Sequence, residues 1–216
     1  SSDLVATPRV SRGVRRSAAM SSTTIISRTP VSSRTSGATN VLAQAPTETM
    51  TIAKALARQG ANIVLNGFGD HATPQAEIQA LGVKTIYHGA DMRKPAEIED
   101  MMHVAAKHFG QVDIVVNNAG TTHRNKPALQ VTEEEFDRVY KVNVKSLFWA
   151  AKTVLPGFVE QGSGCIVNVA STTGVRPGPG LSWYSGSKAA MINITKGLAL
   201  EFAKSGVRIN AVNPMI

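Results

Sequence analysis

Along most of the chain, the spacing of apolar residues switches repeatedly between a strand-like and a helical pattern. Short apolar runs at residues 61–67, 84–88, 112–120, 164–171 and 207–214 end in polar residues or glycine. Between these runs, apolar residues recur at every third or fourth position, which is typical of amphipathic helices. Strands and helices that alternate in this way build βαβ units. The pattern therefore predicts a three-layer α/β/α domain whose parallel sheet is covered by helices on both faces.

The same pattern predicts helices over residues 51–60, 75–82, 95–110, 132–159 and 183–206. Pro95 and acidic residues stand in the first turn of the third helix, and Gly110 stands at its end. Proline and negative charge favour helix starts, and glycine favours helix ends. Thr132 is followed by three glutamates, a sequence that allows a capping box at the start of the long fourth helix.

Residues 1–47 differ in composition from the rest of the chain. They are rich in Ser and Thr and contain six arginines but one acid, Asp3. Organellar transit peptides have this composition, and a disordered tail or a mis-joined reading frame fits equally well. The first residue is Ser rather than Met, which indicates a processed or incomplete chain. We divide the sequence into a basic leader, residues 1–47, and an α/β domain, residues 48–216. The expected location is the cytoplasm, or a mitochondrion or plastid if the leader is a transit peptide.

The net charge of +8 comes mainly from the leader, which carries +5 from six arginines and one acid. These arginines are not interleaved with aromatic residues, so a nucleic-acid partner is disfavoured. No apolar run is long enough to span a bilayer, so we expect no membrane partner. The single Cys165 excludes an internal disulfide framework, and the five histidines lack metal-ligand spacing. A small-molecule partner remains the expectation.

Polar residues at the carboxyl ends of the predicted strands are the candidates for a ligand site, because doubly wound sheets bind ligands there. Tyr184 and Lys188 lie four residues apart on a predicted helix, so phenol and ammonium share one face. A neighbouring cation lowers the pKa of a phenol from its usual value of about 10 towards neutrality. Such a phenol can give a proton to a carbonyl oxygen, or take one from an alcohol, while a hydride moves at carbon. Ser171, at a strand end, can hydrogen-bond the same oxygen, and Asn143 is an amide inside a predicted helix, where a special role is expected.

Five short segments stand together in one order: "NNAG" at residues 117–120, "VNV" around Asn143, "IVNVAS" ending at Ser171, "YSGSK" and "RINAVNP". In this order and approximate spacing they resemble the short-chain dehydrogenase/reductase family, over about residues 50–216. The resemblance implies a Rossmann-like doubly wound fold and a nicotinamide dinucleotide cofactor. It also implies an oxidoreductase that transfers a hydride between the cofactor and a secondary alcohol or ketone.

The resemblance also implies roles for single residues. Tyr184 would be the general acid/base, Lys188 would tune it and hold the nicotinamide ribose, Ser171 would orient the substrate oxygen, and Asn143 would anchor a proton-relay water. The implied cofactor-binding residues are Asn66, Phe68, Asp91, Met92, Asn117, Ala119, Gly120, Tyr184, Lys188, Asn213 and Pro214. Taken singly, several have a plain structural alternative: Asn117, Asn118 and Asn143 as local backbone caps, Ser171 as a strand-end hydroxyl and Asp91 as a helix cap.

The family pattern breaks at both ends of the domain. Family members begin with an apolar strand and a T-G-x-x-x-G-x-G turn, which places the pyrophosphate on a helix N-terminus. Here no glycine occurs from residue 38 to residue 59, and the closest apolar piece is residues 23–27. Without a substitute, the strands at residues 62–66 and 113–117 would have unpaired edges facing a gap. We therefore expect a sheet that is incomplete at its first and last strands, and weak or absent catalysis.

Two resemblances bear on the substrate. "LNGFGD" at residues 65–70 is similar to 3-hydroxybutyrate dehydrogenases, and His123 matches one of their carboxylate-binding residues. "TTGVRPGPGLSWYSGSK" at residues 172–188 is similar to 3-oxoacyl reductases. The cofactor is expected to be NAD or NADP, with NAD favoured by "LNGFGD". The alternative function is that of a catalytically impaired, truncated relative that acts as a subunit or a binding module. Family members pack subunits through the helices that follow Thr132 and Tyr184, so a homo-oligomer is expected.

Overall fold

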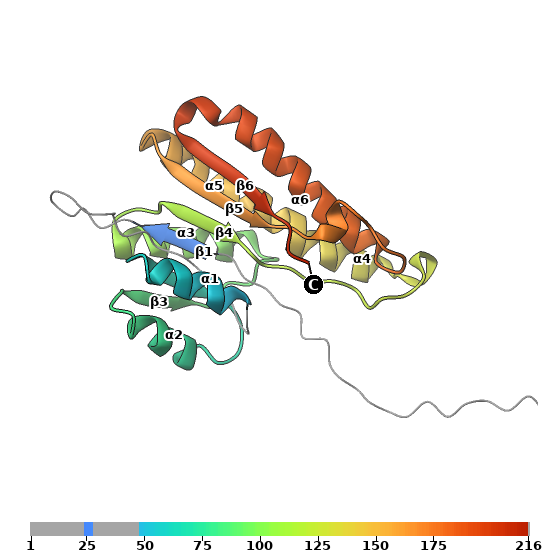
Figure 1. Ribbon diagram of the computed structural model, residues 1–216, viewed down its shortest axis with the longest axis horizontal. Coiled ribbons are helices and arrows are strands. Elements are labelled where there is room, and N and C mark those ends of the chain that lie inside the picture. The colour runs from blue at the N-terminus through green and yellow to red at the C-terminus, as the bar shows by residue number, and fades with distance from the viewer. Residues whose placement is uncertain (1–23, 28–47, 216) are drawn as a thin grey trace, which may run out of the picture.

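The computed structural model describes residues 24–27 and 48–215. They form a six-stranded sheet between two helical layers, with strand order β3-β2-β1-β4-β5-β6 (Figure 1). The strands are β1 (Thr24–Ser27), β2 (Asn62–Asn66), β3 (Thr85–His88), β4 (Ile114–Asn117), β5 (Gly164–Val169) and β6 (Val207–Val212). The α-helices are α1 (Glu48–Ala57), α2 (Ala72–Gln79), α3 (Pro95–Phe109), α4 (Glu133–Tyr140), α5 (Ser146–Glu160) and α6 (Ser182–Glu201). The predicted Rossmann-like α/β fold is confirmed.

Two apolar clusters hold the helices on the sheet. One face packs against α1 and α2, through residues such as Ala53, Ile63 and Ile78. The opposite face packs against α3, α5 and the end of α6, and Met101 and Phe158 are among its fully buried side chains. Because both faces are covered, the central strands are apolar throughout rather than alternating. The helices thus leave the carboxyl edge of the parallel strands as the place where polar side chains gather.

The centre of the sheet is completed by β1, which comes from the basic leader. This strand runs antiparallel to both neighbours: Ile25 lies opposite Val64 of β2 and opposite Val115 of β4. All other pairs in the sheet are parallel. The gap that the sequence predicts between β2 and β4 is therefore filled, but by a strand of reversed direction. Because β1 lies within residues 1–47, the sheet includes residues from before the predicted domain boundary at residue 47. The other residues of the leader lie outside those described.

The reversed direction of β1 separates it from α1. Ser27 lies opposite Asn62 at the start of β2, so β1 ends at the amino edge of the parallel strands. Residues 28–47, which is 20 residues, connect it to Glu48 at the start of α1. A tight strand-to-helix turn at the carboxyl edge, as in the glycine-rich pattern, therefore does not follow this strand.

The long helix predicted from Thr132 is present, with one irregular turn. Thr132 Oγ1 accepts the Glu135 N–H, and Glu135 Oε2 accepts the Thr132 N–H at 3.0 Å, so the predicted capping box is confirmed. A π-helical turn, η2 (Lys141–Lys145), joins α4 to α5. Single π-turns inside helices often mark functional sites. Asn143 lies in this turn.

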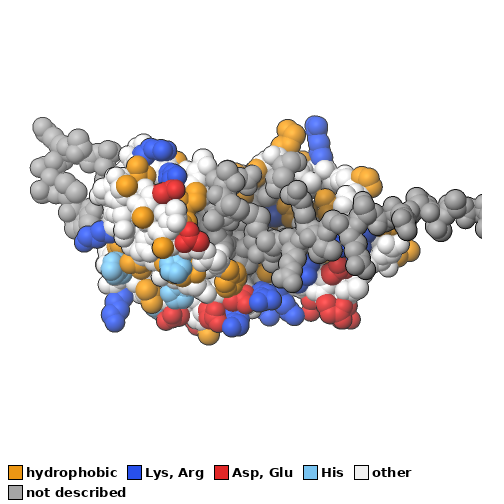
Figure 2. Space-filling view, turned by 90° about the horizontal axis from the view of Figure 1, so that it is seen from below, with side chains coloured by type: hydrophobic (Ala, Val, Ile, Leu, Met, Phe, Trp, Pro, Cys, Tyr) orange, Lys and Arg blue, Asp and Glu red, His pale blue; other side chains and the backbone are white. Residues whose placement is uncertain are grey.

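The surface of the described residues is mixed in charge. Figure 2 shows acidic and basic side chains interspersed along the lower margin of one face. Within residues 24–27 and 48–215, no helix is both long and apolar enough to cross a membrane.

Candidate active site

Helix α6 brings the predicted catalytic pair to the carboxyl edge of the sheet. Lys188 Nζ lies 5.9 Å from the centroid of the Tyr184 ring. Lys188 is 3 % exposed, and its ammonium donates a hydrogen bond to the Val169 carbonyl oxygen at the end of β5, at 2.8 Å. The half-buried Tyr184 and the buried Lys188 therefore share the space above β5, as their spacing predicts.

Burial lowers the pKa of the Lys188 ammonium from 10.5 to about 8. Desolvation disfavours the charged form of an amine, and one neutral carbonyl does not replace the lost water. The amine therefore titrates near physiological pH. Its charge, on which the tuning of the phenol depends, is most complete below pH 8.

The lowered pKa predicts a pH dependence of stability. Because the folded pKa lies below the unfolded value, the unfolded chain binds more protons between pH 8 and 10.5, so stability rises with pH across this window. The shift corresponds to about 3 kcal/mol. Relative to Lys188→Met, wild-type protein should gain up to this free energy of unfolding between pH 8 and 10.5, measured by denaturant unfolding. Parallel pH profiles for the two proteins would contradict the prediction.

Ser171 lies directly after β5 and is 2 % exposed. Its Oγ accepts the Thr173 N–H at 3.2 Å and the Thr173 hydroxyl at 3.0 Å, and it caps the short 3₁₀ turn η3 (Thr172–Gly174). Both contacts use oxygen lone pairs, so the proton of the Ser171 hydroxyl is left to donate to another oxygen. A substrate oxygen is the acceptor that the predicted chemistry would supply.

Asn143 joins the loop after β4 to α6. It is fully buried; its Oδ1 accepts the Thr121 N–H at 2.8 Å, and its Nδ2 donates to the Thr121 carbonyl at 3.0 Å. The second Nδ2 hydrogen goes to Ser187 Oγ at 2.9 Å, and the Ser187 hydroxyl donates to the Tyr184 carbonyl oxygen at 2.6 Å. The side-chain amide of Asn143 thus positions the catalytic helix. Its predicted role in anchoring a water stays a prediction.

The loop after β4, which the family resemblance implies for the adenosine end of the cofactor, lies close to Lys188 at Gly120. A Cβ added to Gly120 would lie 3.4 Å from Lys188 Nζ, so a larger residue would crowd the amine. The Asn117 Nδ2 donates to Asn168 Oδ1 at 2.8 Å, while its own buried Oδ1 has no partner among the described residues. Ala119 is buried beside them. Small residues and one unused amide oxygen leave room and hydrogen-bonding capacity at this strand end.

The residues that follow β6 close the same side. Pro214 is half-buried, and its carbonyl oxygen accepts the Thr172 N–H at 3.1 Å, next to Ser171. Asn213 is exposed. The structure thus brings Tyr184, Lys188, Ser171 and Pro214 to one edge of the sheet.

Other residues predicted for the adenosine end already form hydrogen bonds with neighbouring residues. Both carboxylate oxygens of Asp91 accept hydrogen bonds from the Arg93 guanidinium, at 2.6–3.0 Å, and this contact holds the Asp91 pKa below its usual value. Asn66 donates to the Ala90 carbonyl at 3.1 Å and to the Met92 sulfur at 3.3 Å. Met92 is buried, and Phe68 is 54 % exposed. Asp91 therefore makes local contacts with Arg93, but it does not cap the following helix, since the N-cap residue of α3 is Lys94 and no side chain caps it.

The pyrophosphate end shows the poorest fit. The glycine-rich turn that would place the pyrophosphate on the N-terminus of α1 is absent from the sequence. The residues present therefore fit a nicotinamide ring and ribose better than they fit the two phosphates.

Sequence reasoning missed two residues that support the catalytic set. Isolated Ser and Thr residues carry no spacing signal, so the sequence does not single out Ser187 or Thr173. A usable signal existed for Ser187: a hydroxyl three residues after Tyr184, on the inner face of a helix, commonly bonds back to the preceding turn. Thr173 had the corresponding signal of a hydroxyl two residues after a strand-end serine.

A doubly wound sheet with a Tyr–Lys pair at its carboxyl edge is the arrangement expected of a dehydrogenase-type α/β domain. The chain belongs to the short chain dehydrogenase family, whose family model matches residues 49–216. This family membership supports a nicotinamide cofactor, and two similar solved structures contain one. These are an NAD+-bound xylitol dehydrogenase (30% identity, TM-score 0.74, covering 77% of this chain and 65% of that one) and a Brucella melitensis 3-ketoacyl-(acyl-carrier-protein) reductase complexed with NADH (36%, 0.70, 76% and 69%).

Two curated relatives show similarity over different spans. A 4-formylbenzenesulfonate dehydrogenase of Comamonas testosteroni is 71% identical over 126 residues, which cover 58% of this chain and 50% of the relative. A D-beta-hydroxybutyrate dehydrogenase of Cupriavidus necator is 46% identical over 166 residues, which cover 76% of this chain and 64% of the relative. The chain therefore spans about half to two thirds of the length of these relatives.

Proposed function

We propose that the chain is an NAD(P)-dependent oxidoreductase that transfers a hydride between a nicotinamide and a secondary alcohol or ketone. The observation that carries this proposal is the placement of Lys188 Nζ 5.9 Å from the Tyr184 ring centroid, on the same edge as the capped Ser171. This arrangement provides a proton donor and acceptor, its tuning cation and a hydroxyl for the substrate oxygen. These are the groups that carbonyl reduction requires from a protein.

In the reduction direction, Ser171 donates its free proton as a hydrogen bond to the carbonyl oxygen and holds it beside the Tyr184 phenol. A bound nicotinamide would supply the hydride for the carbonyl carbon. Tyr184 gives its proton to the oxygen as negative charge develops there, which yields the alcohol. Lys188 stabilises the resulting phenolate, and the Val169 carbonyl keeps the amine in place. Oxidation of an alcohol reverses each step.

The favoured cofactor is NAD. Residues 66–71, at the end of β2, contain Asp70 and no Lys or Arg that could bind the extra phosphate of NADP. Asp70 is already used locally: its Oδ1 accepts the Ala72 and Thr73 N–H groups at the start of α2. Discrimination between NAD and NADP would therefore come from the lack of a positive charge at residues 66–71, and a modest preference for NAD is expected.

The favoured substrates are of the 3-hydroxybutyrate or 3-oxoacyl type, as the resemblances of the two halves suggest. The relative named as a 4-formylbenzenesulfonate dehydrogenase adds aromatic aldehydes as a second candidate class. The proton-transfer set above serves either class, because both react at a carbonyl carbon. The competing function is a non-catalytic subunit, since without the glycine-rich turn we expect weak cofactor affinity.

Titration of the purified full chain with NADH and NADPH, followed by nicotinamide fluorescence, tests the proposal first. Turnover is then measured with 3-hydroxybutyrate and a 3-hydroxyacyl thioester at high NAD+, and with an aromatic aldehyde at high NADH. Saturable NADH binding with turnover of one class supports the enzyme. Folded protein that binds neither cofactor would exclude the hydride-transfer function and leave the non-catalytic role.

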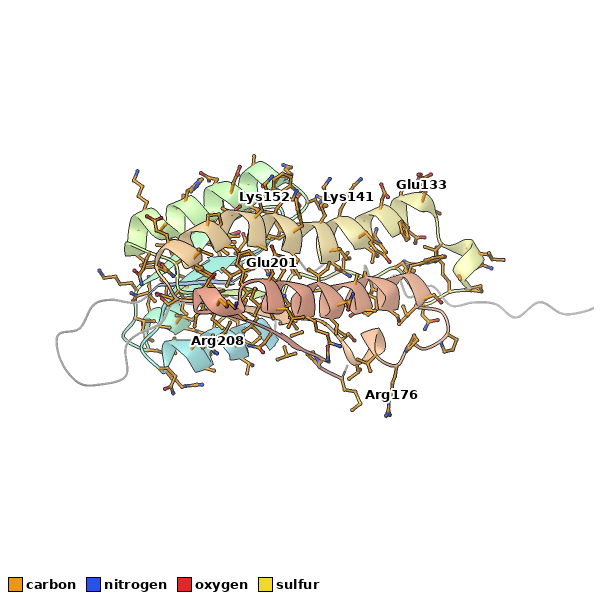
Figure 3. The ribbon with its side chains drawn as sticks, turned by 90° about the horizontal axis from the view of Figure 1, so that it is seen from above. Glu133, Lys141, Lys152, Arg176, Glu201 and Arg208 are labelled. Atoms are coloured by element: carbon orange, nitrogen blue, oxygen red, sulfur yellow. The ribbon has the colours of Figure 1, made fainter. Side chains whose placement is uncertain are left out.

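We further propose that the chain forms a homo-oligomer through α4 and α5. Glu133 and Asp137 lie near the start of this helical row, and Lys145 and Lys152 lie further along it, on either side of Phe148, which is 52 % exposed. Figure 3 shows Glu133, Lys141 and Lys152 projecting to the same side of the row. Two copies packed antiparallel about a two-fold axis would set the acids of one against the lysines of the other.

Charge reversal should therefore change the oligomeric state. Glu133→Lys with Asp137→Lys places like charges opposite Lys145 and Lys152, and is expected to dissociate the oligomer in sedimentation velocity experiments. The converse variant, Lys145→Glu with Lys152→Glu, should dissociate for the same reason, and an equimolar mixture of the two variants should reassociate. A wild-type monomer, or a reversed variant that sediments like wild type, would exclude this interface.

A further inference from the structure

The turn that carries Ser171 packs against the backbone of the catalytic helix at Gly174. A Cβ built on Gly174 would lie 2.8 Å from the Lys188 carbonyl carbon and 2.9 Å from the Ala189 nitrogen. Real Cβ atoms essentially never approach so closely, and both neighbours are backbone atoms of α6, which cannot turn aside as a side chain can. Any residue with a side chain therefore has to push η3 and α6 apart.

This contact is specific to its place in the fold. A Cβ on Gly178, in the loop between η3 and α6, would meet nothing within 4 Å, and the same holds for Gly197 further along α6. The backbone of Gly174 does not have a positive φ, so backbone conformation does not require glycine here. Close approach is what requires it.

Gly174 lies three residues after Ser171, in the turn that Ser171 caps. Thr173 donates two hydrogen bonds to Ser171 Oγ, and the Gly174 N–H donates to the Ser171 carbonyl at 3.0 Å. A displacement of the turn therefore moves the serine hydroxyl with it. On the α6 side, the contact is made by the backbone of Lys188, whose amine lies 5.9 Å from the Tyr184 ring centroid.

We propose that Gly174 is a positioning residue: by permitting backbone-to-backbone contact between η3 and α6, it sets the spacing between the Ser171 hydroxyl and the Tyr184–Lys188 pair. The catalytic meaning of this spacing rests on the proposed function. The spacing itself also governs how deeply the strand end and the turn bury the Lys188 amine. The burial of this amine can be measured through its titration, without turnover.

The test compares Gly174→Ala with Gly178→Ala in the full chain. Labelling of the Lys188 amine with acetic anhydride at a series of pH values, read by mass spectrometry, reports its titration. The pKa of about 8 depends on burial, so opening the contact should move it towards 10.5 in Gly174→Ala and leave it in place in Gly178→Ala. Tyr184 is the titratable side chain beside Nζ, so both variants are also compared in a Tyr184→Phe background. Kinetically, kcat should fall about 10- to 100-fold in Gly174→Ala, the effect expected of an ångström-scale misplacement, with little change in the KM for the nicotinamide.

A folded Gly174→Ala protein that keeps the wild-type Lys188 titration overturns the proposal, whatever its activity. If wild-type protein shows no turnover, the proposed function fails, and the Lys188 titration still decides the role of Gly174. Should Gly174→Ala not fold, the same measurements are made on Gly174→Ala with Ile192→Val, which deletes the Ile192 Cδ1 atom 3.0 Å from the new Cβ. If this double variant also fails to fold, Gly174 serves folding rather than site geometry, and the proposal is wrong.

Discussion

Replacement of Tyr184 by phenylalanine is expected to lower kcat by about 10²- to 10⁴-fold, the range that a positioned general acid/base contributes. The variant keeps the aromatic ring, its place on α6 and its position 5.9 Å from Lys188 Nζ, and it removes only the hydroxyl. Binding of the nicotinamide should change less than kcat does, because the contact proposed for Lys188 remains and only the Tyr184 hydroxyl is removed. Initial rates of nicotinamide absorbance at saturating cofactor provide the measurement.

Tyr140→Phe is the matched control. Tyr140 lies on α4, where its ring stacks on Phe136 with centroids 4.4 Å apart, and it has no part in the proposed proton transfer. The Tyr140→Phe variant should therefore show about the same kcat as wild type. Equal rates for Tyr184→Phe and Tyr140→Phe would show that the phenol of Tyr184 is not the acid/base group.

Introduction of proline at Ile25 should destabilise the chain by more than about 3 kcal/mol, because proline removes an amide donor from the middle of a sheet. Ile25 is paired on both sides, opposite Val64 and Val115. Loss of the pairing of β1 would open the edges of β2 and β4, two buried apolar strands, to water or to other chains. Denaturant unfolding followed by tryptophan fluorescence measures the effect, and aggregation is the expected secondary outcome.

The control for this variant is Ile25→Val, which keeps the amide and a β-branched side chain. Because the backbone pairing of β1 is kept, it is expected to cost much less than Ile25→Pro. If Ile25→Pro and Ile25→Val unfold at the same denaturant concentration, β1 does not contribute to the stability of the sheet.

The sequence predicted most of the fold, and its one large omission has a physical cause. Apolar runs and capping signals located five strands, and they placed the start of the long helix at Thr132, where the capping box is found. The direction of β1 was beyond this reasoning, because a four-residue strand with two apolar residues reads the same for a parallel and an antiparallel strand. The π-turn was equally hidden, since one irregular turn barely disturbs the spacing of apolar residues on either side.

For the candidate site, spacing along one helix was informative and contacts between segments were not. Tyr184 and Lys188 could be paired from their separation of four residues. The engagement of Asp91 by Arg93, and of Asn143 by Thr121 and Ser187, depends on how loops fold back, and no local pattern encodes it. Gly174 is the extreme case, because its role depends on the backbone of another segment.

The π-turn at residues 141–145 has a consequence for the length of the chain. A π-turn holds one residue more than a regular α-helical turn, so removing one residue within 141–145 would leave an uninterrupted α-helix with the segments on either side in the same phase. Leu147, Ala150 and Val154 would stay on the buried face together with Val139, whereas removing a residue from α5 itself would rotate the residues after it by about 100°. A deletion inside the turn should therefore leave the packing of this helix on the sheet largely intact and act mainly on the placement of Asn143.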